Sequence, residues 1–168
     1  QNQWSWRDSS GALLGWDAVG QKWVGDGSEV YLVAWVSGFR HSSSGSIRDC
    51  VVRWTAPDDG EVTISGSFKL ATTPGSVRCK IMHGVVELVS FDLTDETTYP
   101  YNEDITVVAG DTVDFVSQRI STSFFNNNVE LNPVIQLTTD GTTPANPVLS
   151  TLSPSTMTIS SNGTGSLA

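Results

Sequence analysis

Hydrophobic and polar residues alternate along much of this chain with a period of two, the period of a β-strand that has one buried face. The segment 61–70 (EVTISGSFKL) shows the pattern most clearly, because Val62, Ile64 and Phe68 fall on one face and hydroxyl side chains fall on the other. Patterns with a helical period are nearly absent. Strand-like patterns also occur in segments 29–36, 49–54, 77–82, 85–93, 105–108, 112–118 and 134–137. Together these segments predict an all-β domain.

Short clusters of Gly, Asp, Pro and Asn separate the predicted strands, and these residue types favour tight turns. The clusters include TAPDDG at 55–60, HG at 83–84, AGD at 109–111 and NNN at 126–128. Strands of this length and spacing are typical of two packed antiparallel sheets. The sequence therefore predicts an antiparallel β-sandwich, with a jelly roll as the expected topology.

The composition changes after Leu137. Residues 138–156 contain three prolines among Thr, Ser and Asn, as in a linker, and hold too few apolar residues to form a core. The segment Ser155–Ser160 (STMTIS) then forms a lone strand-like pattern, and a single strand cannot bury its own face. We therefore predict a β-sandwich domain over residues 1–137, and a linker with a lone C-terminal strand over residues 138–168. That strand either begins a further domain or pairs with another sheet.

The charge balance excludes several classes of partner. The 168 residues include 9 Lys and Arg against 18 Asp and Glu, which gives a formal net charge of −9. A chain this acidic lacks the basic face that nucleic acids and anionic membrane surfaces require. No apolar run approaches about 20 residues, so the sequence predicts no membrane span. Abundant Ser and Thr, few Lys residues and a start at Gln1 without a signal region predict a mature extracellular or cell-surface chain, or an excised fragment.

The two cysteines, Cys50 and Cys79, leave two alternatives open. They form one disulfide in an oxidising compartment, or they remain two buried thiols. Two cysteines are too few to define a disulfide framework, so the sequence does not decide between the alternatives.

The chain lacks the short motifs that commonly carry catalysis or cofactor binding, including HExxH, paired CxxC, GxSxG, and the Walker and GxGxxG loops. Its two histidines lie in Ser- or Gly-rich turn contexts. We therefore predict that the chain is not an enzyme and needs no cofactor. A charged loop leaves one alternative open, since its carboxylates either form a solvated face or supply oxygen ligands to calcium. The carboxylates of this loop are Asp92, Asp95, Glu96, Glu103 and Asp104.

Six tryptophans are many for a chain of this length, and each is either a core residue or an exposed platform. An exposed indole or phenol ring can stack on the apolar face of a sugar ring, and its rigidity limits the entropy lost on binding. Four tryptophans precede the first long strand pattern, in a segment rich in Gly, Ser, Asp and Gln. We predict that these four either pack over a sheet end or contact ligand. Trp35 and Trp54 lie within apolar strand patterns and are predicted core residues.

Other side chains complete a predicted ligand-binding set. Tyr99 and Tyr101 flank Pro100 in a predicted loop, and one of the neighbours Phe124 and Phe125 is expected to be exposed. Asn, Arg and His side chains near such aromatics can form hydrogen bonds with sugar hydroxyls. The full set is Trp4, Trp6, Trp16, Trp23, Arg40, His41, Tyr99, Tyr101, Phe125 and Asn127.

Three stretches carry a resemblance to known proteins: RWTAPDDGEVTISG at 53–66, VVAGDTVDF at 107–115 and NNVELNPVI at 127–135. Together with the opening WSW at 4–6, they resemble bacterial secreted β-sandwich modules of the carbohydrate-binding type, which are appended to polysaccharide-active enzymes. The resemblance covers about residues 1–137, and it implies a sandwich fold, a structural role for Trp54 and a glycan partner. The tail from Asn146 is similar to the opening strand of Ig-like modules.

Two functions are therefore expected. The first is a non-catalytic carbohydrate-binding or adhesin-like module, whose partner is a polysaccharide or other glycan and whose exposed aromatics stack on sugar rings. The alternative is a structural subunit of an extracellular filament or of a surface or phage assembly. In the alternative, the C-terminal strand completes the sheet of a second copy, and the contact is head-to-tail and generates an open polymer.

Overall fold

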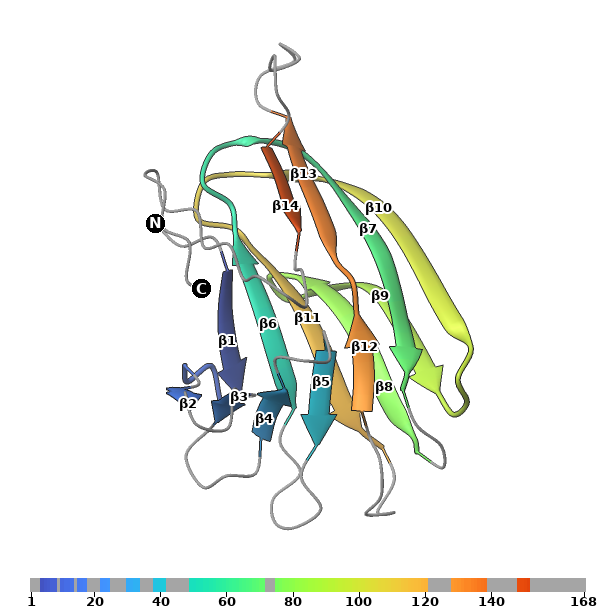
Figure 1. Ribbon diagram of the computed structural model, residues 1–168. Helices are drawn as coiled ribbons and strands as arrows, with labels where there is room; N and C mark the ends of the chain where they lie inside the picture. Colours follow the sequence, from blue (N-terminus) through green and yellow to red (C-terminus); the bar gives the residue numbers. More distant parts are fainter. Residues whose placement is uncertain are drawn as a thin grey trace.

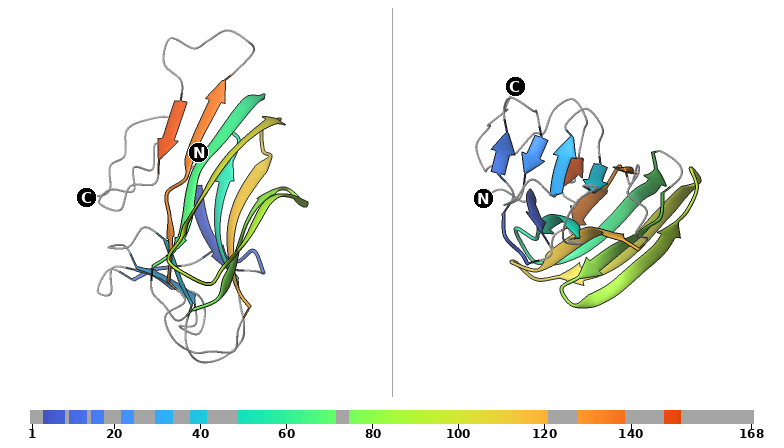
Figure 2. Two further views of the ribbon diagram at one scale, coloured as in Figure 1. Left: turned by 90° about the vertical axis from the view of Figure 1, so that its right-hand side faces the viewer. Right: turned by 90° about the horizontal axis from the view of Figure 1, so that it is seen from below.

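The computed structural model describes residues 4–8, 10–13, 15–17, 22–24, 30–33, 38–41, 49–71, 75–120, 128–138 and 148–151. In these ranges the regular secondary structure consists of β-strands, and every strand pairing is antiparallel. The strands form two sheets, a small sheet of five strands and a large sheet of nine. The two sheets are seen as two layers in Figure 2.

The small sheet has the strand order β1-β6-β11-β8-β9. Its strands are β1 (Trp4–Asp8), β6 (Cys50–Thr55), β11 (Thr112–Arg119), β8 (Val77–His83) and β9 (Val86–Leu93). β9 ends this sheet, and its register shifts between Ile81 and Met82 of β8, so that Leu88 is an extra residue in the edge strand. Such a bulge increases the local twist of the strand.

The large sheet has the strand order β14-β13-β7-β12-β5-β4-β3-β2, and β10 pairs with the other side of β7 (Figure 1). Its strands are β2 (Gly15–Asp17), β3 (Lys22–Val24), β4 (Val30–Val33), β5 (Gly38–His41), β7 (Gly60–Leu70), β10 (Thr98–Val107), β12 (Asn128–Leu131), β13 (Val134–Thr138) and β14 (Val148–Thr151). β12 and β13 follow one another along the same side of β7. The expected antiparallel β-sandwich is confirmed, and the finer expectation of a jelly roll stays a prediction.

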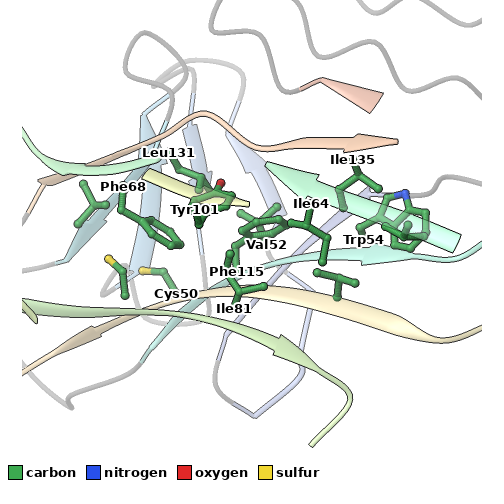
Figure 3. Close-up of a cluster of buried hydrophobic side chains, with 14 of the residues drawn as sticks. Cys50, Val52, Trp54, Ile64, Phe68, Ile81, Tyr101, Phe115, Leu131 and Ile135 are labelled. Atoms are coloured by element: carbon green, nitrogen blue, oxygen red, sulfur yellow. The ribbon is translucent and has the colours of Figure 1, made fainter. Parts of the chain in front are cut away.

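The core lies between the two sheets and is built from the alternating positions that the sequence predicts. On β7, Val62, Ile64, Phe68 and Leu70 are each at most 1% exposed. Trp54 of β6 is also 1% exposed, which confirms it as a core residue. Figure 3 shows side chains of both sheets meeting in one apolar layer. The expected linker at 138–156, however, contains a strand, because β14 pairs with β13.

Gly66 interrupts the apolar side of β7, and the structure shows why glycine occupies this position. Its φ angle is 144°, a conformation that residues with a side chain rarely adopt. A Cβ atom here would overlap the carbonyl oxygen of Asn132 and lie 2.7 Å from the hydroxyl of Tyr101. Tyr101 lies directly opposite Gly66 on β10, and its ring centroid is 5.1 Å from that of Phe68. The tyrosine ring therefore fills the space that a side chain at position 66 would take.

The two cysteines are buried, and both are free. Cys50 on β6 and Cys79 on β8 lie opposite Ser117 from its two sides, so β11 runs between them. Two strand spacings amount to about 10 Å, whereas a disulfide needs Cα atoms less than about 7 Å apart. The strand order therefore settles the open alternative in favour of two thiols. Burial raises the pKa of both, that of Cys79 to about 12.

Asp111 links two turns and the end of a strand at one end of the sandwich. Its carboxylate accepts a hydrogen bond from the Val108 amide at 3.1 Å and lies 3.2 Å from Nε2 of His83. Its carbonyl oxygen accepts a hydrogen bond from the Ala56 amide at 2.8 Å. These bonds link the β6–β7 turn, the β10–β11 turn and the end of β8. The TAPDDG and AGD clusters of the sequence therefore form one joined structure.

Candidate functional site

The first two predicted ligand residues, Trp4 and Trp6, lie in β1. Trp4 lies opposite Trp54, is half-buried, and packs against the core. Its ring stacks on that of Phe115, with centroids 6.0 Å apart and an interplanar angle of 29°. Trp6 occupies the register position opposite Val52 of β6. Of the two alternatives for these residues, the structure supports packing for Trp4.

The two predicted tyrosine platforms lie in a strand rather than in a loop, because residues 98–107 form β10. Tyr101 is 6% exposed and contacts Phe68 and Phe115 within the core, so the prediction of a platform there is wrong. Tyr99 is half-buried, and its ring centroid is 5.4 Å from that of Phe91. Tyr101 therefore offers no free ring face, whereas ligand contact by the half-buried Tyr99 stays a prediction.

The remaining predicted residues gather in strands β2 to β5, apart from Phe125 and Asn127, which lie outside the described residues. Trp16 on β2 and Trp23 on β3 are directly opposite one another. Residues directly opposite in an antiparallel pair share a face of the sheet, and successive residues alternate between the faces. The strand register therefore assigns each of these positions to one face.

The face of the two tryptophan positions follows from their neighbours. Trp23 lies opposite Leu32 of β4. Tyr31 of β4 lies opposite Arg40 of β5, so the adjacent residues Leu32 and Phe39 together occupy the other face. Phe39 lies opposite Val129, which is fully buried in the core. Trp16 and Trp23 are thus on the inner face of the large sheet. Their contact with ligand stays a prediction, and the register favours the packing alternative.

The outer face carries a different set of positions. Tyr31 on β4 lies opposite Arg40 on β5, and Arg40 lies opposite Asn128 on β12. These three positions form one row across neighbouring strands, although they are separated by almost a hundred residues in the sequence. His41, which was predicted together with Arg40, lies opposite Val30 and falls on the inner face. Arg40 therefore belongs to the row on the outer face, whereas His41 lies on the opposite face of the sheet.

Described polar side chains continue this row towards the middle of the sheet. Asn128 Oδ1 is buried and has no hydrogen-bond partner among the described residues. Two positions along β12, Glu130 lies opposite Lys69 of β7, with Oε2 and Nζ 4.0 Å apart. We call the set Tyr31, Arg40, Lys69, Asn128 and Glu130 the outer patch. It lies over β4, β5, β12 and β7, and the last three run side by side in Figure 1.

The outer patch combines the groups that sugar recognition needs. A carboxylate and an amide oxygen accept hydrogen bonds from hydroxyls, while ammonium and guanidinium groups donate to hydroxyl and ring oxygens. A tyrosine position at the margin adds an aromatic ring of the type that stacks on sugars. The set contains both cations and an anion, so it is suited to a polar ligand rather than to a highly charged one.

Four of the five residues of the outer patch were missed by sequence reasoning. Tyr31 lies within the apolar run EVYLVAWV, which was interpreted as a buried strand. Asn128 was assigned to a turn, Lys69 lies on the polar side of the predicted strand 61–70, and Glu130 was not placed in any predicted strand. A signal was present in the alternation, because Lys69 falls on the polar side of 61–70. The pairing of β7 with β12, which brings Lys69 and Glu130 together, has no counterpart in local sequence.

The charged loop that was considered for calcium is divided between separate contacts. Arg78 donates two hydrogen bonds to Asp92, at 2.6 and 2.8 Å, and lowers the pKa of that carboxyl. Asp95 accepts a hydrogen bond from the Thr97 amide, and its pKa is lowered by hydrogen bonds from this residue. Asp104 accepts one from Thr63 on β7. Within the described ranges, no three His, Cys, Asp or Glu residues are grouped to hold a metal ion. The calcium alternative stays a prediction.

The part of the chain that the structure describes contains no helix long and apolar enough to cross a membrane. Comparison with known proteins finds no matching family model and no matching curated protein. Among solved structures, the chain is similar to a family 35 carbohydrate-binding module from an environmental isolate, with 14% identity and a TM-score of 0.38 over 62% of this chain and 74% of that one. It is also similar to the enzymatically active domain of tailspike protein 4 of bacteriophage CBA120, with 11% identity and a TM-score of 0.39 over 81% of this chain and 19% of that one. Similarity at this level carries no argument about function.

Proposed function

We propose that this chain is a non-catalytic, extracellular carbohydrate-binding or adhesin-like module that binds a polysaccharide through the outer patch. The observation that carries the proposal is the row of Tyr31, Arg40 and Asn128 on the outer face of the large sheet. An aromatic position, a cationic position and an amide from three strands adjoin one another there. In this proposal the chain has no catalytic step and needs no cofactor.

The unpartnered oxygen of Asn128, a member of the row, is a second observation that supports the proposal. A buried acceptor without a hydrogen bond costs about 1–3 kcal/mol, so such a group is expected to have a role. Because Oδ1 is buried, a sugar hydroxyl reaches it only when the groups that cover it move aside; the hydroxyl is then a suitable donor, since it is small and uncharged and can rotate towards the acceptor. The backbone at this position is already fixed, since the Ala71 amide donates to the Asn128 carbonyl at 2.8 Å.

The test is depletion of the purified chain from solution by insoluble cellulose, xylan, mannan and chitin, and by pectin and alginate gels. Where a polymer retains the chain, Tyr31→Ala and Arg40→Ala are expected to weaken binding by about 1–3 kcal/mol, or about 5- to 150-fold. Gln136→Ala is the matched control, because Gln136 is exposed on β13 of the same sheet, outside the outer patch. Retention by none of the polymers, or equal retention of all the variants, would contradict the proposal.

The structural-subunit alternative is separated from this proposal by a deletion. The expected donor strand, Ser155–Ser160, lies outside the described residues. The strand that the structure does show in the tail, β14, pairs with β13 of its own chain. Removing residues 152–168 keeps β14 and removes the expected donor. If the full chain polymerises in analytical ultracentrifugation and the shortened chain is a monomer, strand donation is supported, whereas a monomeric full chain contradicts it.

A further inference from the structure

Gly38 leaves a gap in the side chains of the outer face. It lies opposite Glu130 of β12, and Glu130 lies opposite Lys69 of β7. Gly38 and Arg40 are two residues apart on β5 and therefore share the outer face. Since glycine has no side chain, the row that contains Glu130 and Lys69 is interrupted at the middle of the outer patch. A glycine inside a strand is often found where a ligand approaches the backbone closely.

The Glu130 carboxylate beside this gap is only loosely engaged. Its distance of 4.0 Å to Lys69 Nζ is longer than a hydrogen bond, and the two side chains are 38% and 37% exposed. The small sheet shows what a fully engaged pair looks like, because Arg53 donates to Asp114 through two bonds of 2.7 Å. Among the described residues, Glu130 therefore has acceptor positions that no hydrogen bond fills, and its side chain is 38% exposed. Asn128, two residues before it on the same face, has the unpartnered Oδ1.

We propose that one neutral pyranose ring of the glycan lies over Gly38 and that the Glu130 carboxylate accepts hydrogen bonds from its adjacent hydroxyls. This inference rests on the proposed function and names the class of sugar at the same site. Two neighbouring hydroxyls match the two oxygens of one carboxylate, and hydrogen bonds to a charged acceptor are shorter and stronger than those to a neutral one. Lys69 lies beside this carboxylate, with Nζ 4.0 Å from Oε2.

The sign of the charge at Glu130 selects against acidic sugars. A uronate ring over Gly38 would bring a second carboxylate close to that of Glu130, and like charges at an interface disfavour binding. The net charge of −9 adds a general repulsion towards polyanions. The expected ligand is therefore a neutral polysaccharide such as cellulose, xylan, mannan or chitin, rather than pectin or alginate.

The experiment measures binding of two variants to each polymer of the depletion panel. Gly38→Val fills the gap with a residue that strands favour, and Glu130→Gln removes the charge while keeping the shape. Both are expected to weaken binding to a neutral polysaccharide at least tenfold, while Gln136→Ala leaves it unchanged. Thermal unfolding of each variant is measured in parallel. If Gly38→Val lowers the unfolding temperature, its binding result is set aside, and the binding of Glu130→Gln alone tests the inference.

The outcomes separate the inference from the proposed function. If the chain binds a neutral polymer and both variants bind it equally well, the inference is wrong and the proposed function stands. If the chain binds pectin or alginate and Glu130→Gln strengthens that binding, the site takes an acidic sugar and the inference is overturned. If the unmodified chain binds no polymer, the proposed function fails and the inference fails with it.

Discussion

Replacing Tyr101 by phenylalanine should stabilise the protein, although the residue is at the centre of the core. Tyr101 is 6% exposed, and its hydroxyl is buried without a hydrogen-bond partner among the described residues. Burial raises the pKa of the phenol far above its usual value, so the group stays neutral at every accessible pH. The substitution removes this one polar atom and leaves the ring against Phe68 and Phe115.

The expected size of the effect follows from two opposing terms. An unpaired buried polar group costs about 1–3 kcal/mol, and Tyr101→Phe removes that cost. The same change loses the van der Waals contacts of one oxygen atom, each about 0.1–0.2 kcal/mol, or about 1 kcal/mol in total. The net result is a gain of about 1 kcal/mol in the free energy of unfolding. For a chain of this size that corresponds to a rise of about 2–4 °C in the unfolding temperature.

The assay is urea unfolding at pH 7, followed by tryptophan fluorescence. The variant should shift the midpoint upwards with an unchanged slope, because the surface exposed on unfolding is the same. Tyr99→Phe is the matched control, since Tyr99 lies two residues away on the same strand and face but is only half-buried. A Tyr101→Phe variant less stable than the parent by 0.5 kcal/mol or more, on the order of a weak hydrogen bond, would show that the hydroxyl has a partner and would refute the reasoning.

Three further predictions concern the backbone, the thiols and the acid response. Gly66→Ala should cost about 2–4 kcal/mol in urea unfolding, because it combines an unfavourable φ with overlap of neighbouring atoms, and a cost below about 1 kcal/mol would contradict this. Cys50 and Cys79 should not react with a thiol reagent in the folded protein, and two thiols should appear on unfolding in urea without reductant; one or none would indicate a disulfide. The hydrogen bonds from the Val108 amide and from His83 lower the pKa of Asp111. Its ionised carboxylate therefore stabilises the folded state above about pH 4, and this stabilisation is lost as the pH falls through the lowered pKa. The stability difference between the parent and Asp111→Asn should therefore be largest near pH 6 and shrink towards pH 2, and a difference independent of pH would argue against the assignment.

Alternation predicted the strands with one buried face. Segment 61–70 became β7, and the strand-like segment 112–118 lies within β11, where the alternate residues Val113, Phe115 and Ser117 are all buried. The same reasoning found only the end of β10, at 105–108, because a proline and several acids make 98–104 look like a loop. In the structure β10 pairs through one side alone among the described strands, and a proline is tolerated in an edge strand. Local composition cannot show that a strand lies at an edge.

The candidate site was less accessible from sequence than the core. In EVYLV every position but the first is apolar or aromatic, so alternation does not say which side faces outwards, and Tyr31 is assigned only by its pairing with Arg40. The state of the cysteines depended in the same way on β11 lying between their strands. Pairing between distant strands is a property of the whole fold. The residues that meet through it were therefore the ones that the sequence could not place.

The edges of the two sheets bear on how crowded copies of this chain behave. Open strand edges are templates for the stacking of like chains into fibres, and natural proteins interrupt them. Pro100 removes an amide donor from β10, and the extra residue at Leu88 distorts β9. Copies concentrated on one surface or repeated along one polypeptide are therefore less prone to join through the edges at β9 and β10. The same two residues are the positions to leave untouched if the sandwich is used as a scaffold for display.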